Sequence, residues 1–274
     1  METIPPFLLA GCRFSTAGFL LMFALRAFGI KFPDWADWKR VALVGFLLLS
    51  CANALIAFAE QHVDSGFAAL MVNSGPFLFV GFSAMAGERV PRLAWTGLAV
   101  GFLGIFILTG GPLLNLLRGD NSLVTPGFWG AIGALTAASI LWSFGSFLSG
   151  KRPVKCHPLM TAAAQSAAGG IGGFVIAAFT GELFHAHAPS AASVYAVCFL
   201  VVVGSWLGYV SYVYCLQNLP SHSTATTTYL NMVVAIFVGW LFLSETITPV
   251  KLVGGAVTLL GVYIVNQAKE KKPV

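Results

Sequence analysis

Residues 88–108 have the sequence ERVPRLAWTGLAVGFLGIFIL, and residues 245–265 have the sequence ETITPVKLVGGAVTLLGVYIV. The two stretches align without a gap at an offset of 157 and are identical at seven of 21 positions. The shared positions include two glycine pairs and one glutamate pair, namely Gly97/Gly254, Gly104/Gly261 and Glu88/Glu245. Apolar composition alone does not place two glycines and a glutamate in one register. The match therefore indicates an internal repeat.

The composition places the chain in a membrane. Only 9% of its 274 residues are charged, 57% are hydrophobic and the mean hydropathy is +0.84. A soluble domain carries about 25% charged residues. The formal net charge of +5 comes from basic residues that are dispersed over short loops. Such a pattern is typical of membrane topology and does not indicate a nucleic-acid-binding surface.

Sequence motifs for catalysis and for metal binding are missing. The chain has no GxSxG, Walker or HExxH motif, so we expect no enzyme activity. Its five cysteines form no CxxC pair, and four of them lie in apolar stretches, where they act as small apolar side chains. We expect no disulfide, no metal site and no cofactor.

Nine apolar stretches alternate with short polar loops. A helix needs about 20 residues to cross about 30 Å of hydrocarbon, and lipid forces backbone groups into helices or closed barrels. The runs are continuous rather than alternating, which excludes strands. The prediction is an all-α, polytopic membrane protein with nine transmembrane helices, at about 6–28, 41–59, 66–87, 94–110, 127–148, 158–179, 192–216, 223–243 and 251–265.

The distribution of basic residues predicts the orientation. When alternate loops are assigned to the cytoplasm, twelve of the 15 Lys and Arg residues fall inside and two fall outside. The remaining one, Arg13, lies within the first stretch. Cytoplasmic loops carry an excess of Lys and Arg. We therefore expect a cytoplasmic C-terminus and, with nine crossings, Met1 on the opposite side.

The repeat extends over the whole chain. The first four stretches match the last four, giving one repeat in 1–115 with four helices and a second in 116–274 with five. Corresponding stretches are five crossings apart, an odd number, so the repeats are predicted to be inverted. The fifth stretch has no partner, and the pattern implies one more helix ahead of residue 1. Many secondary transporters build a site near the midplane from inverted repeats.

Several segments resemble the EamA family of the drug/metabolite transporter superfamily, in particular a bacterial subgroup of inner-membrane exporters. The resemblance covers essentially the whole chain. Each matching segment alone is a weak signal, but the set of segments in this order is specific. Its residues are PPFLLAGCRFSTAGFLL (5–21), AEQHVDSGFAALMVNSGPFLF (59–79), GERV with WTGLAVGFLGIFIL (87–108) and NMVVAIFVGWLFLSETITPVKLVGGAVTLLGVYIV (231–265).

The resemblance implies two inverted five-helix repeats, of which the first helix is missing here. It also implies a proline after Asn231, where this chain has Met232. The counterpart in the first repeat, Pro76, is present. A kink in the eighth stretch therefore lacks its proline.

Arg13 is the residue in the membrane that most needs an explanation. It lies seven residues past Pro6, about 10 Å along the helix. An arginine at depth costs about 2.5–3.5 kcal/mol on insertion scales, so it is expected to face a polar interior or to reach the interface. One interpretation is a fixed charge that binds a substrate carboxylate or phosphate. The other is an arginine that snorkels to the headgroups.

Other polar and aromatic residues are candidates for the same substrate site. The residues with hydrogen-bonding side chains come from several stretches. One of them, Gln165, is the repeat counterpart of Arg13. Such side chains also commonly bond to a neighbouring helix, and a single aromatic side chain more commonly packs in the core. The predicted substrate-binding residues are Arg13, Asn53, Asn73, Ser74, Trp142, Gln165, Tyr209, Tyr212 and Asn231.

These observations favour a multi-pass secondary transporter of the bacterial inner membrane. We expect it to export small metabolites, such as amino acids or related amphipathic compounds, by alternating access. One alternative is a carrier of nucleotide sugars or phosphorylated metabolites, and another is a truncated, non-transporting membrane subunit. The expected partners are a small-molecule substrate and the lipid bilayer but no nucleic acid, and the chain is expected to be a monomer or homodimer.

Overall fold

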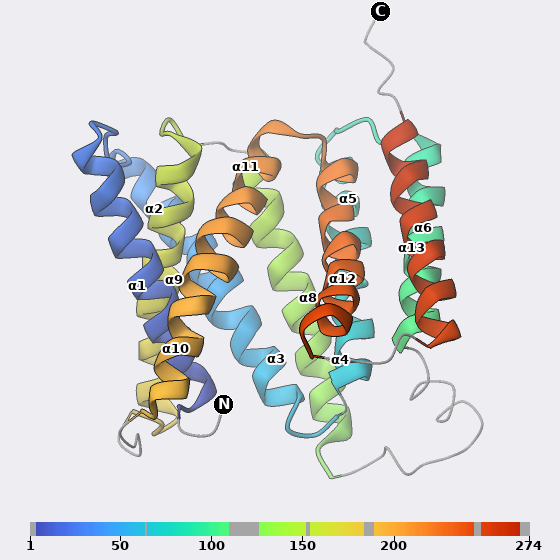
Figure 1. Cartoon of the computed structure of the whole chain (residues 1–274). Coiled ribbons are helices and arrows are strands. Elements are labelled where there is room, and N and C mark those ends of the chain that lie inside the picture. The colour runs from blue at the N-terminus through green and yellow to red at the C-terminus, as the bar shows by residue number, and fades with distance from the viewer. Residues whose placement is uncertain are drawn as a thin grey trace, which may run out of the picture. The chain divides into compact units, whose positions relative to one another are not determined.

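The structure is a computed structural model that describes residues 4–63, 65–109, 126–151, 154–183, 189–243 and 248–268. All regular secondary structure in these ranges is helical (Figure 1). Eight helical spans are long and apolar enough to cross a membrane. The remaining predicted stretch is the 23-residue helix α12. The prediction of an all-α, polytopic membrane protein is confirmed.

The helices follow the predicted stretches to within a few residues, except that the second begins earlier and three are interrupted. The elements are α1 (Pro6–Ala27), α2 (Trp35–Gly45), η1 (Phe46–Ala52), α3 (Asn53–Ala59), α4 (Ser65–Val72), α5 (Gly75–Met85), α6 (Arg92–Thr109), α8 (Phe128–Lys151), α9 (Pro158–Phe179), α10 (Ala191–Phe199), η3 (Leu200–Tyr209), α11 (Val210–Asn218), α12 (Ser221–Leu243) and α13 (Pro249–Gln267).

Two compact units make up the chain, and neither coincides with a sequence repeat. Unit 1 consists of Met1–Phe58 and Phe144–Leu219, and unit 2 consists of Ala59–Ser143 and Pro220–Val274. Each unit therefore contains segments from both 1–115 and 116–274. The cause is that matched helices pack against each other rather than against their own repeat.

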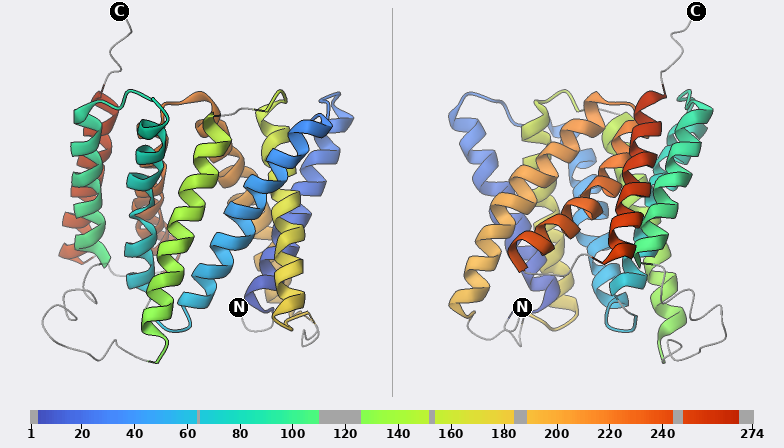
Figure 2. Two further views of the ribbon diagram at one scale, coloured as in Figure 1. Left: turned by 180° about the vertical axis from the view of Figure 1, so that it is seen from behind. Right: turned by 45° about the vertical axis from the view of Figure 1, so that its right-hand side comes forward.

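The matched helices α6 and α13 form the tightest contact of unit 2, and they lie side by side in Figures 1 and 2. Gly97 lies against the Gly261 carbonyl, and Gly104 lies against the Gly254 carbonyl. The helices therefore run antiparallel. The repeat alignment exchanges the two contacts, because it pairs Gly97 with Gly254 and Gly104 with Gly261. A local twofold relation between inverted copies requires this exchange.

Helices α1 and α9 repeat the arrangement in unit 1. Gly18 packs on the backbone of Ala167, and Gly170 packs on the backbone of Ser15. The alignment that pairs Pro6 with Pro158 exchanges these contacts as well. Both contacts lie at the middle of their 22-residue helices. Glycines thus allow the close approach of α6 to α13 and of α1 to α9.

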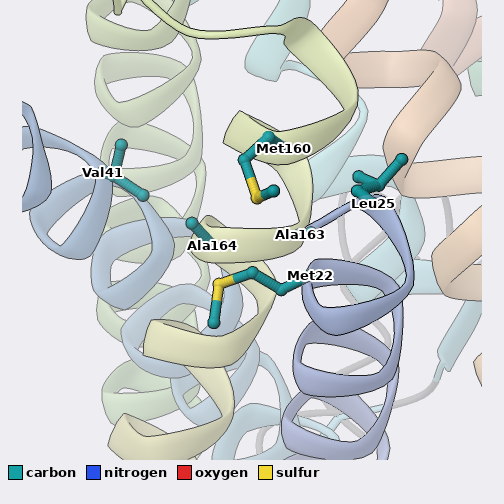
Figure 3. Packing of buried hydrophobic residues seen from close by; sticks show 6 residues of the cluster. All are labelled: Met22, Leu25, Val41, Met160, Ala163 and Ala164. Atoms are coloured by element: carbon teal, nitrogen blue, oxygen red, sulfur yellow. The ribbon is translucent and has the colours of Figure 1, made fainter. Parts of the chain in front are cut away.

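A small apolar cluster closes one end of the α1–α9 pair. Figure 3 shows Met22 and Leu25 from α1 beside Met160 and Ala164 from α9, with Val41 from α2 alongside. Val41, Met160 and Ala164 are completely buried. Lipid tails provide little hydrophobic drive between helices, so this packing acts mainly through van der Waals contact.

The third predicted span breaks where the first repeat has its proline. Helix α4 ends at Val72, Asn73 and Ser74 form a turn, and α5 begins at Gly75 with Pro76 in its first turn. A proline lacks the N–H for the helical ladder and clashes with the preceding turn. Helix α12, which has Met232 in place of the expected proline, is continuous. The missing kink is thus explained by one residue.

Both the second and the seventh spans contain π-helical turns. Segment η1 follows Gly45, and η3 contains Gly204. Gly45 packs on the backbone of Gln165, whereas Gly204 packs on the side chain of Arg13. Arg13 and Gln165 are repeat counterparts, so each member of this pair has a glycine beside it from a span with π-helical turns. Segments of π-helix are rare in proteins, and those that occur are frequently found at functional sites.

Carboxylates cap two helices in these units. Glu182 accepts hydrogen bonds from the backbone N–H groups of Phe7 and Leu8, at 2.9 and 3.0 Å, and caps α1. Glu88 accepts from the Ser221 N–H at 2.9 Å and from its hydroxyl at 2.6 Å, and caps α12. An anion at a helix N-terminus is stabilised by the helix dipole. Glu88 thus supports loop structure, whereas its counterpart Glu245 lies outside the described residues.

The glycine contacts predict a position-specific loss of stability on α13. Substitution Gly261→Ala places a methyl group into the backbone of Gly101 and is expected to destabilise the protein by about 1–3 kcal/mol. Gly255→Ala is the matched control, because no atom lies within 4 Å of a β-carbon built there. Thermal unfolding of the purified variants in detergent measures the difference. Equal melting temperatures for the two variants would contradict the close packing of α6 and α13.

Candidate functional site

The structure divides the nine predicted site residues between the units. Unit 1 holds five of them, and unit 2 holds Asn73, Ser74, Trp142 and Asn231. The five in unit 1 are Arg13, Asn53, Gln165, Tyr209 and Tyr212. Two of these, Arg13 and Gln165, bond to the same segment, η3. The best-defined polar arrangement therefore lies in unit 1.

Arg13 turns into unit 1. Its Nε donates a hydrogen bond to the Ser205 hydroxyl at 3.2 Å, and its guanidinium carbon lies 4.7 Å from the centre of the Phe14 ring. Its distance from the middle of α1 is three to four residues, or about 5 Å. The structure records no carboxylate paired with Arg13 among the described residues. The geometry favours the interior interpretation over snorkelling.

Gln165 is the uncharged counterpart of Arg13 and lies about 5 Å from the middle of α9. Because α1 and α9 are antiparallel, Arg13 and Gln165 lie on opposite sides of the contact between the helix middles. Its side chain is 1% exposed. The Tyr209 hydroxyl donates to Gln165 Oε1 at 2.9 Å, and Gln165 Nε2 donates to the Ser149 hydroxyl at 3.1 Å. A buried amide needs partners at both ends, and this one has them. The chain Ser149–Gln165–Tyr209 fixes the amide in position.

Three predicted ligands use their donors on nearby backbone. Asn53 donates to the carbonyls of Leu48 and Leu49, which belong to η1. Asn73 donates to the Ala69 carbonyl at 2.6 Å, and Ser74 donates to the Met71 carbonyl at 2.6 Å. Polar side chains commonly bond to the preceding turn of their own helix. In this structure the three residues hold the irregular backbone of η1 and of the α4–α5 turn.

The remaining predicted residues have separate environments. The Tyr212 hydroxyl lies 2.7 Å from the Ser146 hydroxyl in unit 1. Tyr209 is buried, so its ring packs within unit 1. Trp142 is half-buried, and Asn231 is exposed on α12. Arg13 and Gln165 thus both bond to segment η3, which contains Tyr209, whereas Trp142 and Asn231 belong to unit 2.

A small recess in unit 1 lies beside the N-terminal part of α1. It is lined by Pro6, Ala10, Ser50, Asn53 and Gly173, among others, and has a volume of about 30 Å³. Ligand pockets for small molecules are typically about 300–1,000 Å³. The recess has room for a water molecule rather than a metabolite.

Sequence reasoning missed the residues that position Arg13 and Gln165. Ser205 and Ser149 are almost fully buried, and Trp206 donates its Nε1–H to the Ala17 carbonyl of α1 at 2.9 Å. A serine in an apolar stretch carries no clear signal, and Ser205 is 192 positions from Arg13. The repeat gives no signal either, since the matched helices align at offsets of 152 and 157, whereas Gly204, the residue before Ser205, lies 159 positions after Gly45. The described residues contain no cluster of His, Cys, Asp or Glu that could hold a metal ion.

Antiparallel pairs of matched membrane-spanning helices define a polytopic membrane protein of the inverted-repeat class, to which many secondary transporters belong. The model of the EamA-like transporter family matches residues 1–110 and 128–267. The chain belongs to this family and is a multi-pass membrane transporter.

Relatives extend over nearly all of the chain. It is 32% identical over 270 residues to an Escherichia coli K12 protein called "Uncharacterized inner membrane transporter YedA", covering 98% of this chain and 84% of that one. It is 27% identical to the "Probable terminal-alkyne amino-acid exporter" of Streptantibioticus cattleyicolor, covering 93% and 82%. A crystal structure with 19% identity matches the fold at a TM-score of 0.79, covering 97% of this chain and 88% of the other.

The hydrogen bond between Tyr209 and Gln165 predicts a measurable contribution to stability. Tyr209→Phe leaves the buried amide oxygen of Gln165 without that donor and is expected to cost about 1–3 kcal/mol. Tyr214→Phe is the control, because Tyr214 is 54% exposed. Thermal unfolding in detergent compares the two variants. If Tyr209→Phe unfolds at the temperature of Tyr214→Phe, the hydrogen bond has no structural importance.

Proposed function

We propose that this transporter exports small carboxylate-bearing metabolites, amino acids among them, across the inner membrane by alternating access. Arg13 is the observation that carries the proposal. Arg13 lies about 5 Å along the helix axis from the middle of α1, and its guanidinium is bonded to a neutral hydroxyl. Polar and ionisable residues inside a membrane are expensive, and by default they indicate a functional site. A carboxylate is the simplest group that compensates a guanidinium through paired hydrogen bonds.

The number of cations favours a carboxylate over a phosphate. Arg13 is the one basic residue in the interior of the nine apolar stretches, since the other 14 lie in loops or at helix ends. A phosphate group carries up to two negative charges, and nucleotide sugars carry a diphosphate. One guanidinium balances one carboxylate. The carrier of phosphorylated metabolites is therefore the weaker alternative.

The relatives support the same substrate class and location. The Streptantibioticus protein is named as a probable exporter of an amino acid, and the Escherichia coli protein is named as an inner membrane transporter. Twelve of the 15 basic residues fall on one side of the predicted topology. That side is the cytoplasmic one by the positive-inside rule. We assign the C-terminus to the cytoplasm.

A reporter fusion tests the orientation. A green fluorescent protein joined after Val274 is expected to fluoresce, and alkaline phosphatase joined at the same place is expected to be inactive, because the former matures in the cytoplasm and the latter in the periplasm. The matched control carries each reporter after residue 120, in a loop that the topology places outside. Active phosphatase after Val274 would reverse the assignment.

An efflux experiment tests the substrate class. Cells that overproduce the chain are loaded with labelled amino acids, and extrusion is followed by mass spectrometry of the medium. Arg13→Gln, which copies the repeat counterpart, is expected to reduce carboxylate export at least about tenfold, because two charge-assisted hydrogen bonds are lost. Export of simple amines should change less.

Membrane abundance of each variant is the control for folding. Equal loss for carboxylates and amines at normal abundance would contradict the role of Arg13. The absence of any extruded solute with wild-type protein in the membrane would contradict the transport proposal itself.

A further inference from the structure

Gly204 and Ser205 form the surface of η3 on which the Arg13 guanidinium lies. The Ser205 hydroxyl accepts the Nε hydrogen bond at 3.2 Å and is 1% exposed. A β-carbon at Gly204 would lie 2.5 Å from Arg13 Nη2. The Phe14 ring covers the guanidinium at 4.7 Å. Three different contacts thus set the orientation of one side chain.

We propose that Gly204 and Ser205 turn the Arg13 guanidinium so that it binds a carboxylate end-on, through Nη1 and Nη2. A guanidinium offers two forked edges to a carboxylate, one formed by Nε and Nη2 and the other by the two terminal nitrogens. The contacts with η3 occupy the edge of Nε and Nη2. The end edge is the one that remains for a ligand. This inference rests on the proposed function and names the geometry of its site.

The repeat supplies the reason for assigning this arrangement to binding rather than to packing alone. Gly45 packs on the backbone of Gln165, whereas Gly204 packs on the guanidinium of Arg13, so a glycine lies beside each member of the repeat pair but only Gly204 contacts the side chain. In the second repeat the amide of Gln165 is held at both ends by Ser149 and Tyr209. The guanidinium of Arg13 has five N–H donors, of which one makes the hydrogen bond to Ser205. The equivalent position in the first repeat therefore has donors to spare.

The experiment measures binding to purified protein and does not depend on knowing the natural substrate. Sodium propionate is the minimal carboxylate probe, and propylammonium chloride is the cation of similar size. The shift of the melting temperature with propionate concentration gives an apparent dissociation constant. Ser205→Ala is expected to weaken propionate binding roughly five- to twentyfold, because the guanidinium loses its anchor. Ser205→Thr keeps the hydroxyl and should restore binding to within about threefold.

Matched controls separate aiming of the guanidinium from general stability. Ser50→Ala removes a similarly buried hydroxyl of η1, which donates to the Gly169 carbonyl of α9. This variant should leave the dissociation constant of propionate unchanged. Gly204→Ala pushes on Nη2 and should weaken binding at least about tenfold. Gly208→Ala lies on the same segment with its nearest neighbour at 3.4 Å and should bind as the wild type does.

The outcomes decide between the two levels of the proposal. The end-on geometry is overturned if Ser205→Ala or Gly204→Ala binds propionate with wild-type affinity. It is also overturned if Arg13→Gln still binds propionate, or if the wild-type protein does not bind it. If the protein exports solutes but its propionate affinity does not depend on Ser205, only this inference is wrong. A chain that binds propionate through Ser205 and exports nothing retains this geometry and loses the proposed function.

Discussion

The close antiparallel approach of matched helices is the contact on which both compact units depend. In lipid, helices have little hydrophobic reason to associate, so small residues that allow backbones to touch supply much of the contact energy. Gly97 and Gly261 provide this in unit 2, and Gly18 and Gly170 provide it in unit 1. The repeat alignment maps each glycine contact of a helix pair onto the other contact of the same pair, so each pair contains two equivalent contacts. A change at one of these glycines alters one of the two equivalent contacts of its pair and leaves the other unchanged.

This packing also determines where a charge is tolerated. With α1 and α9 in contact at their middles, the positions three to four residues away on either side leave the glycine face and meet the neighbouring spans. Arg13 and Gln165 occupy these two positions, and each lies against a glycine of a span that contains π-helical turns. The cost of burying a guanidinium is offset in part by Ser205 and Phe14. Neither of them carries a charge that neutralises the guanidinium, and this is the feature on which the proposed carboxylate site rests.

Sequence reasoning was accurate where the bilayer imposes the answer. Span positions and the helical class follow from hydrocarbon thickness and backbone hydrogen bonding, and the structure has both. The break before Pro76 was not predicted, although proline stereochemistry explains it. The bilayer does not impose the partners of a polar side chain, and the predicted site residues remain predictions. Asn53 and Asn73 were predicted as ligands, but their amides bond to the backbone of their own segments. Periodicity cannot show this, because both uses need the same polar residue in the same apolar run.

The composition of the two units has a similar explanation. Residues 1–115 and 116–274 are repeats in sequence, whereas the compact units exchange their helices. Alignment identifies which helices are equivalent but does not state which ones touch, and in an inverted pair the equivalent helices are free to be mutual neighbours. Within the α1–α9 pair the result is a local twofold relation in which one of two equivalent positions carries a charge. Arg13 has that charge and Gln165 does not, and the proposal of a carboxylate site in one repeat rests on this difference.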